Sequence, residues 1–460
     1  MIRPLTHRAL WAFFAATLVG CHAPQGLLRV AGNAPKASPG PWAGAKPSAA
    51  PIAAATPAVV PDQLIVALKP GVTPETWLAQ PKAAGFTLRG SIRLSGRHVL
   101  KVGIPKALER DAARLLAAET EGVQRVTEDP VPRTAAFTFT QKDTRLDEQW
   151  AHVARHGNTL DAWEKVPLAD QAKIIVAVLD TGLDVAHPEF AGRVIGARNF
   201  TAATPDADVT DTQGHGTHVT GIVGATGNNN VGVAGVAWGV KLMPVKVLGD
   251  SGLGGTFDIL QGILYAAAFV PSPDDGSRVR VINMSLGTPT GGTDALYAEA
   301  IAQAHAAGVL VVAATGNDGR GIVGQPATTP HALAVGATAR YLNWESLAAF
   351  SNYGNRLDLV APGEDILSTF PTAGSGMGQT YGMASGTSMA SPYVAGVAAL
   401  IAAKYDKANA SLTPAFATKL RNRLIAATDD MGAPGWDPVY GAGRLNANRA
   451  VTPATIDATP

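Results

Sequence analysis

Residues 173–184 read KIIVAVLDTGLD, and this stretch decides the fold of the 460-residue chain. Its unbroken aliphatic run is typical of a strand buried on both faces, because a strand with one solvated face alternates apolar and polar side chains. The run ends at Asp180, and the functional groups of open parallel sheets lie beyond the carboxyl ends of their strands. We therefore predict an α/β protein whose active side chains follow its strands.

Three further apolar runs extend this prediction: Lys241–Val247, Val279–Met284 and Gly308–Ala314. Segments with a helical pattern separate them, and this alternation is typical of a mostly parallel sheet covered by helices on both faces. We expect one large α/β domain over residues 143–450, with residues 451–460 as a tail.

The composition excludes several classes of protein. Lys and Arg number 37 and Asp and Glu number 36, so the formal net charge is +1. A protein that binds nucleic acid or an anionic membrane surface as its main activity needs concentrated positive charge. The single cysteine excludes a disulfide framework and a cysteine-cluster metal site.

The amino terminus predicts export. Two arginines precede an apolar run over residues 9–20, which is too short to span a hydrocarbon layer of about 30 Å. Residues 18–21, LVGC, resemble the lipobox of bacterial lipoproteins. The resemblance implies that residues 1–21 are a lipoprotein-type signal and that a lipid on Cys21 anchors an extracellular or cell-envelope protein. An ordinary signal peptide with a chance cysteine is the alternative. The Ala/Pro-rich residues 22–60 predict an extended linker.

Residues 61–133 have the pattern of a small separate domain. The expected order is strand, helix, strand, strand, helix, strand, which is the ferredoxin-like α+β arrangement. We expect the strands over Gln63–Lys69, over Thr87–Val102 as a pair, and over Val123–Val126, with helices over Thr73–Ala84 and Lys106–Thr120. Taken alone, this pattern fits any small binding domain.

Three polar residues stand at element boundaries of the large domain: Asp180 in DTGLD, His215 in HGTHVTGI and Ser388 in GTSMASP. A serine hydroxyl becomes a nucleophile when a base removes its proton, and a carboxylate holds that base in the required tautomer. Each residue alone also has a structural explanation, as a cap or a packed side chain. A non-catalytic role for any one of them therefore remains open.

Together, and in this order, the three motifs resemble the signatures of the subtilisin-like serine proteases, the subtilases. The resemblance implies a subtilisin-like three-layer fold in which Ser388 attacks a peptide carbonyl, His215 transfers the proton and Asp180 orients His215. It also makes Asn317, in TGNDG, an oxyanion donor. An amide N–H aimed at the developing negative oxygen suits that role.

The resemblance further implies an extended peptide held between two segments, with broad specificity and an apolar preference. Glycines in these segments let two backbones approach closely. The expected substrate-binding residues are Gly252, Leu253 and Gly254 on one side, Ser285, Leu286 and Gly287 on the other, and Gly316 at the primary pocket.

A structural calcium ion is expected by the same resemblance, since oxygen-ligated ions stabilise exported enzymes that lack disulfides. The implied ligands are Glu189, the loop 227–233 through Asn228, Asn230 and Val233, and either Asp143 or Gln149. A polar turn without an ion is the alternative.

The resemblance finally gives the small domain a meaning, as a propeptide that assists folding and blocks the active site. Processing is expected within residues 134–142, and protein or peptide substrates and a monomeric enzyme are implied. Two competing hypotheses share the fold: a catalytically silent binding or chaperone protein, and an acyl transferase or ligase that uses the same triad.

Overall fold

The computed structural model describes residues 59–94, 96–105, 113–114, 117–130, 133–134, 146–153, 155–202, 206–272, 274–289, 291–341, 344–372, 380–406 and 413–452. The predicted signal, most of the linker, the processing segment beyond Thr134, Asp143 and most of the tail lie outside these residues. Within them, no helix combines the length and the hydropathy that crossing a membrane requires.

The amino-terminal domain is an antiparallel sheet of order β2-β3-β1-β4. Its strands are β1 (Val59–Leu68), β2 (Thr87–Leu94), β3 (Arg97–Gly103) and β4 (Val123–Pro130). This is the strand order of a ferredoxin-like unit. The first expected helix is shorter than predicted. It divides into α1 (Pro74–Leu78) and a 3-10 turn that begins at Pro81, because proline has no N–H to continue a helix. Of the described residues of the second expected helix, 113–114 and 117–118 are helical, and 119–120 form a turn.

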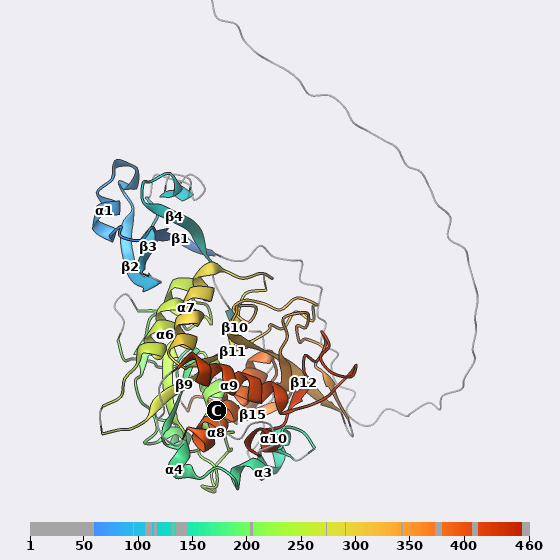
Figure 1. Cartoon of the computed structure of the whole chain (residues 1–460). Coiled ribbons are helices and arrows are strands. Elements are labelled where there is room, and N and C mark those ends of the chain that lie inside the picture. The colour runs from blue at the N-terminus through green and yellow to red at the C-terminus, as the bar shows by residue number, and fades with distance from the viewer. Residues whose placement is uncertain are drawn as a thin grey trace, which may run out of the picture. The chain divides into compact units, whose positions relative to one another are not determined.

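The large domain is built on a sheet of order β17-β18-β14-β12-β11-β9-β6-β8-β7, with β13 paired to β12. Figure 1 labels β9, β11 and β12 of this sheet. All pairs are parallel except β12–β13 and β17–β18, which confirms the predicted mostly parallel fold. The bounds are β6 (Ile174–Asp180), β7 (Arg198–Asn199), β8 (Lys241–Lys246), β9 (Arg278–Met284), β11 (Leu310–Ala314), β12 (Ala332–Tyr341), β13 (Trp344–Leu347), β14 (Leu359–Pro362), β17 (Thr428–Asp429) and β18 (Arg444–Leu445).

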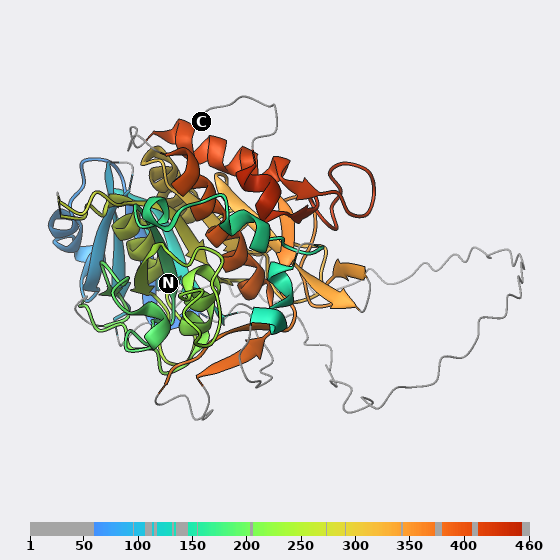
Figure 2. The ribbon, with the colours of Figure 1, turned by 90° about the horizontal axis from the view of Figure 1, so that it is seen from below.

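Strand β6 divides its side chains between two cores, as a fully buried strand must. Val176 and Val178 pack in the core that includes residues of α5 (His215–Gly224) and α8 (Thr387–Tyr405). Ile175 and Leu179 pack in the core under α6 (Thr256–Ala268) and α7 (Ala295–Ala306). The helices of both layers can be followed by colour in Figure 2. The remaining elements are α3 (Leu160–Trp163), α4 (Leu168–Gln171), α9 (Pro414–Ala426), α10 (Ala447–Val451), β15 (Ile366–Thr369) and β16 (Tyr381–Ala384).

The small domain contacts the large one through its sheet and through its carboxyl end. Ile65, Leu94 and Val99 of its sheet belong to the same apolar core as α6 and α7. Its carboxyl end then forms β5 (Arg133–Thr134), which pairs antiparallel with β10 (Leu286–Gly287) of the large domain. The predicted substrate-binding segment therefore already holds an extended backbone.

Candidate active site

Asp180 and His215 meet where β6 ends and α5 begins. Asp180 is the last residue of β6 and His215 the first of α5, and both side chains are buried. His215 Nδ1 donates to Asp180 Oδ1 at 2.7 Å. A histidine that donates through Nδ1 has its proton-accepting position at Nε2, so this pair has the form of an oriented general base.

Ser388 lies in the first turn of α8 and is fully buried. Its hydroxyl donates to the carbonyl oxygen of Ser285 at 3.2 Å, and the Ser285 hydroxyl donates to the Ser388 carbonyl at 2.8 Å. Asn283, at the end of β9, extends this link by donating to Ser285 Oγ and accepting from Ser391 Oγ. Ser388 is thus fastened to the segment that pairs with β5.

Asn317 is held by the residue that precedes the nucleophile. Its Oδ1 accepts from Thr387 N at 2.9 Å and from Thr387 Oγ1 at 2.7 Å, and the same hydroxyl accepts from Gly316 N at 3.2 Å. Two hydrogen bonds to Oδ1 fix the orientation of the Asn317 amide. Its Nδ2 lies beside Gly386, and a Cβ built on Gly386 would lie 2.9 Å from that nitrogen. An N–H donor is therefore held near Ser388, as an oxyanion site requires.

The two expected substrate-binding segments differ in their contacts with the carboxyl end of the small domain. Leu286 and Gly287 pair with Thr134 and Arg133. A Cβ at Gly287 would lie 2.4 Å from the carbonyl oxygen of Gln325, so glycine is required there. In the described part of the chain this tail pairs only with β10. Gly252, Leu253 and Gly254 form a separate turn after β8, in which Gly249 N donates to the Leu253 carbonyl at 2.8 Å.

Comparison with known proteins gives the family. The sequence profile described as the subtilase family matches residues 171–443, a span that includes every candidate residue from Asp180 to Ser388. The chain belongs to the subtilase family. It is 40% identical to subtilisin Savinase of Lederbergia lenta over 276 residues, which are 60% of this chain and 89% of that protein. An extracellular protease of Xanthomonas campestris pv. campestris is 34% identical over 440 residues, 85% of this chain and 73% of that protein.

Solved structures agree on the fold. Fervidolysin from Fervidobacterium pennivorans, described as a keratinolytic enzyme related to subtilisin, superposes with a TM-score of 0.69 at 24% identity. That match covers 86% of this subtilase and 61% of fervidolysin. A protease from Pseudoalteromonas arctica matches with a TM-score of 0.57 at 32% identity, over 67% of this chain and 98% of that one. The chain is therefore a member of a family of serine peptidases.

The structure adds Asp211, which the sequence analysis missed. This buried carboxylate accepts five hydrogen bonds: from Thr181 Oγ1, from the backbone N–H groups of Gln213, Gly214 and Thr217, and from Thr217 Oγ1. Thr181 directly follows Asp180, and its hydroxyl also accepts from Gly216 N at 2.9 Å. Asp211 thus joins the end of β6 to the start of α5, the two elements that must meet for Asp180 to reach His215. An Asp four residues before His215 was the only available sequence signal.

The residues expected to bind calcium are only partly brought together. Glu189 is buried, and the loop residue against it is Asn229, whose Nδ2 donates to Glu189 Oε2 at 2.9 Å. Asn228 and Asn230 are exposed. Side chains alternate along this loop, so a shift of one residue changes which of them face inward. Val233 contacts Glu189 through its backbone N–H at 3.3 Å.

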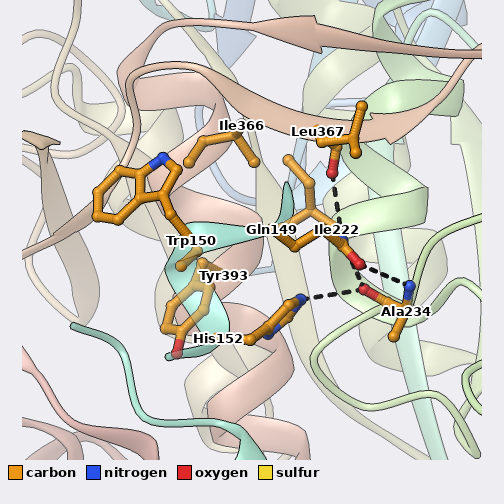
Figure 3. A pocket seen from close by; sticks show the side chains of 9 residues that line it. Gln149, Trp150, His152, Ile222, Ala234, Ile366, Leu367 and Tyr393 are labelled. Atoms are coloured by element: carbon orange, nitrogen blue, oxygen red, sulfur yellow. Dashed lines mark hydrogen bonds between the residues drawn. The ribbon is translucent and has the colours of Figure 1, made fainter. Parts of the chain in front are cut away.

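Gln149, the other candidate ligand, is occupied by backbone groups. Its Oε1 accepts from Ala234 N at 2.9 Å, and its Nε2 donates to the carbonyl oxygens of Ala234 and Leu367 (Figure 3). The small pocket drawn there includes none of the catalytic residues. No cluster of three or more His, Cys, Asp or Glu suited to a metal occurs in the ranges that the structure describes. Calcium binding stays a prediction.

We predict that Asp211→Asn lowers kcat on the order of 10²-fold with little change in KM, because small misplacements of catalytic groups cost this much. The Asn side chain would carry an NH2 group in place of one carboxylate oxygen. That NH2 group would face the N–H and O–H groups that now donate to Asp211. Steady-state kinetics on a short peptide substrate measures the effect. Asp208→Asn is the matched control, since Asp208 is exposed and, among the described residues, its carboxylate accepts from the N–H and hydroxyl of Thr210 in the same turn. A folded Asp211→Asn enzyme with wild-type kcat would contradict this role.

Proposed function

We propose that this subtilase is a serine endopeptidase made as a zymogen, whose own amino-terminal domain occupies the substrate cleft. The observation that carries the proposal is the pairing of β5 with β10 next to Ser285, the residue whose carbonyl accepts the Ser388 hydroxyl. An enzyme that binds extended peptides adds them as a strand to such an edge. The prodomain tail makes that contact from within the same chain.

The geometry supports acyl-enzyme chemistry. Ser388 Oγ attacks the peptide carbonyl while His215 Nε2 takes its proton, and Asp180 stabilises the imidazolium that forms. The negative oxygen accepts from Asn317 Nδ2 and from the Ser388 backbone N–H at the start of α8, where the helix dipole also favours negative charge. His215 then gives its proton to the leaving amine, and water releases the acyl group by the reverse steps.

The register of β5 supports one bond as the processing site. Arg133 lies opposite Gly287 and Thr134 opposite Leu286. If a bound tail continues this register by one residue, its next residue, Ala135, would pair with Ser285, whose carbonyl accepts the Ser388 hydroxyl. The proposed scissile bond is therefore Ala135–Ala136, within the processing segment expected from the sequence.

Two partly buried ion pairs support a prodomain that stays bound after cleavage. Lys101 Nζ lies 2.5 Å from Asp258 Oδ1 of α6, and Arg97 pairs with Glu299 of α7. The four side chains are between 13% and 22% exposed, so water screens them less than it screens surface pairs. Lys101 also lies 5.1 Å from the ring centre of Phe257. The cleaved prodomain would then act as an inhibitor.

Export is supported by the extracellular protease of Xanthomonas campestris pv. campestris, which matches most of this chain. A lipid on Cys21 stays part of the proposal, because that residue lies outside the described ranges. If the lipid is present, a bound prodomain would keep the cleaved protease at the envelope. A catalytically silent binding protein predicts instead that Ser388 does not react with a fluorophosphonate probe.

We predict that the wild-type chain yields a mature enzyme that begins at Ala136, and that Ser388→Ala stays uncleaved. Mass spectrometry of the purified products identifies both termini. Cleavage of purified Ser388→Ala at the same bond would show that another protease does the processing. A wild-type terminus elsewhere would contradict the register argument but not the zymogen. Absence of probe labelling on the processed wild type would refute the protease assignment itself.

We further predict that Lys101→Met weakens the hold of the cleaved prodomain at least tenfold, about 1.4 kcal/mol, because Asp258 loses its cation. Dilution of the processed complex dissociates the cleaved prodomain and restores protease activity. The concentration at which activity returns therefore measures the affinity of the prodomain for the enzyme. Lys82→Met is the matched control within the same domain, since Lys82 and its partner Glu119 are 54% and 64% exposed and such pairs contribute little. Equal dilution curves for wild type and Lys101→Met would rule out the ion pair as a determinant of binding.

A further inference from the structure

Glu189 is a buried carboxylate whose oxygen atoms both face protein donors. It lies in the 3-10 turn Pro188–Phe190 and is fully buried. Oε2 accepts from Asn229 Nδ2 at 2.9 Å, and Oε1 accepts from the Tyr381 hydroxyl at 3.1 Å and from Val233 N at 3.3 Å. These donors come from the loop after α5 and from β16, so one side chain joins three separate segments.

The guanidinium of Arg193 partly offsets the negative charge of the Glu189 carboxylate. Burial raises the pKa of Glu189, while its three hydrogen bonds and the positive charge of Arg193 act in the opposite direction. The Arg193 guanidinium is itself anchored, to the Glu189 carbonyl, to Thr226 Oγ1 and to the Val240 carbonyl. Burial lowers the pKa of Arg193 to about 10, although the negative charge of Glu189 acts to raise it. The chain therefore places a guanidinium near the carboxylate, with its hydrogen bonds going to the Glu189 carbonyl, Thr226 and Val240.

This donor set does not fit calcium. The ion takes six to eight oxygen ligands at about 2.3–2.6 Å, whereas N–H and O–H groups point at both oxygens of Glu189. The Gln149 amide oxygen accepts from Ala234 N instead of facing Glu189. Asn228 and Asn230 adopt φ of +57° and +61° in an exposed turn. A calcium ion would have to displace bonds that already satisfy the buried carboxylate.

We propose that Glu189, Asn229, Tyr381 and Arg193 replace a calcium ion in this subtilase, and that the loop 226–233 is fastened without one. The packing around Tyr381 agrees with a permanent closure. Gly232 has φ +61°, and a Cβ there would lie 2.1 Å from the Tyr381 ring. Val233 and Tyr381 also share a small apolar cluster with Leu367 and Met383. The loop covers the ring, and the ring carries the hydroxyl that holds Glu189.

The test measures how far calcium raises the melting temperature of the processed enzyme, with Ser388 blocked by a sulfonyl fluoride to prevent autolysis. Wild type and Glu189→Gln are each scanned at one rate in excess chelator and in excess CaCl2. We expect the calcium-dependent increment to be the same in both proteins, zero if the rest of the molecule binds no calcium. A wild-type increment of 5 °C or more that is absent in Glu189→Gln would overturn the proposal.

Two further variants keep the test decisive. Asn229→Ala allows the same comparison if Glu189→Gln does not fold, since a calcium site here would need that loop side chain. Tyr381→Phe should lower the melting temperature by about 2–4 °C, equally with and without calcium. Tyr341→Phe is its matched control, at an exposed hairpin end. A Tyr381→Phe defect that added calcium repairs would also contradict the proposal.

Discussion

The hydrogen bond between Asp180 and His215 is the constraint on which the rest of the structure depends. Its partners are 35 residues apart and fully buried, so the end of β6 must meet the start of α5 within a fraction of an ångström. Asp211 sets that junction from one side. Lys246 of β8 supports the same junction from the neighbouring strand. It lies opposite Asp180 in the parallel register and donates to the Thr181 carbonyl. Buried polar groups are costly unless all are paired, so these bonds favour a single arrangement.

The proposed propeptide role divides between two surfaces of the small domain. A large parallel sheet joins strands that are distant in sequence, and such contacts form slowly because loop-closure entropy precedes any gain. A preformed four-stranded sheet that contributes Ile65, Leu94 and Val99 to the core under α6 and α7 offers those helices a surface on which to dock. The tail, through β5, instead covers the peptide-binding edge. As a propeptide, the small domain would therefore assist folding and inhibit through different residues.

The sequence predicted backbone elements well and long-range side-chain pairing poorly. Continuous aliphatic runs placed β6 and β8 to within one residue, because burial on both faces leaves an unambiguous pattern. Thr387 and Tyr381 were missed because their roles arise from partners 70 and 192 residues away, Asn317 and Glu189, which no local pattern records. The loop 227–233 lacks periodicity, so its inward-facing Asn229 could not be told from its neighbours.

In the proposed mechanism, the segment that pairs with the peptide also positions Ser388. Ser285 receives the Ser388 hydroxyl through its carbonyl and binds the Ser388 carbonyl through its own hydroxyl, while the next two residues pair with the bound strand. In the proposed mechanism, a peptide that adds to β10 is thereby aligned with Ser388, whether it is a substrate or the tail of the small domain. Pairing with β10 is common to both. The ion pairs on α6 and α7 are contacts outside that edge, and under the proposed function they would hold the small domain more tightly than a peptide that makes the strand pairing alone.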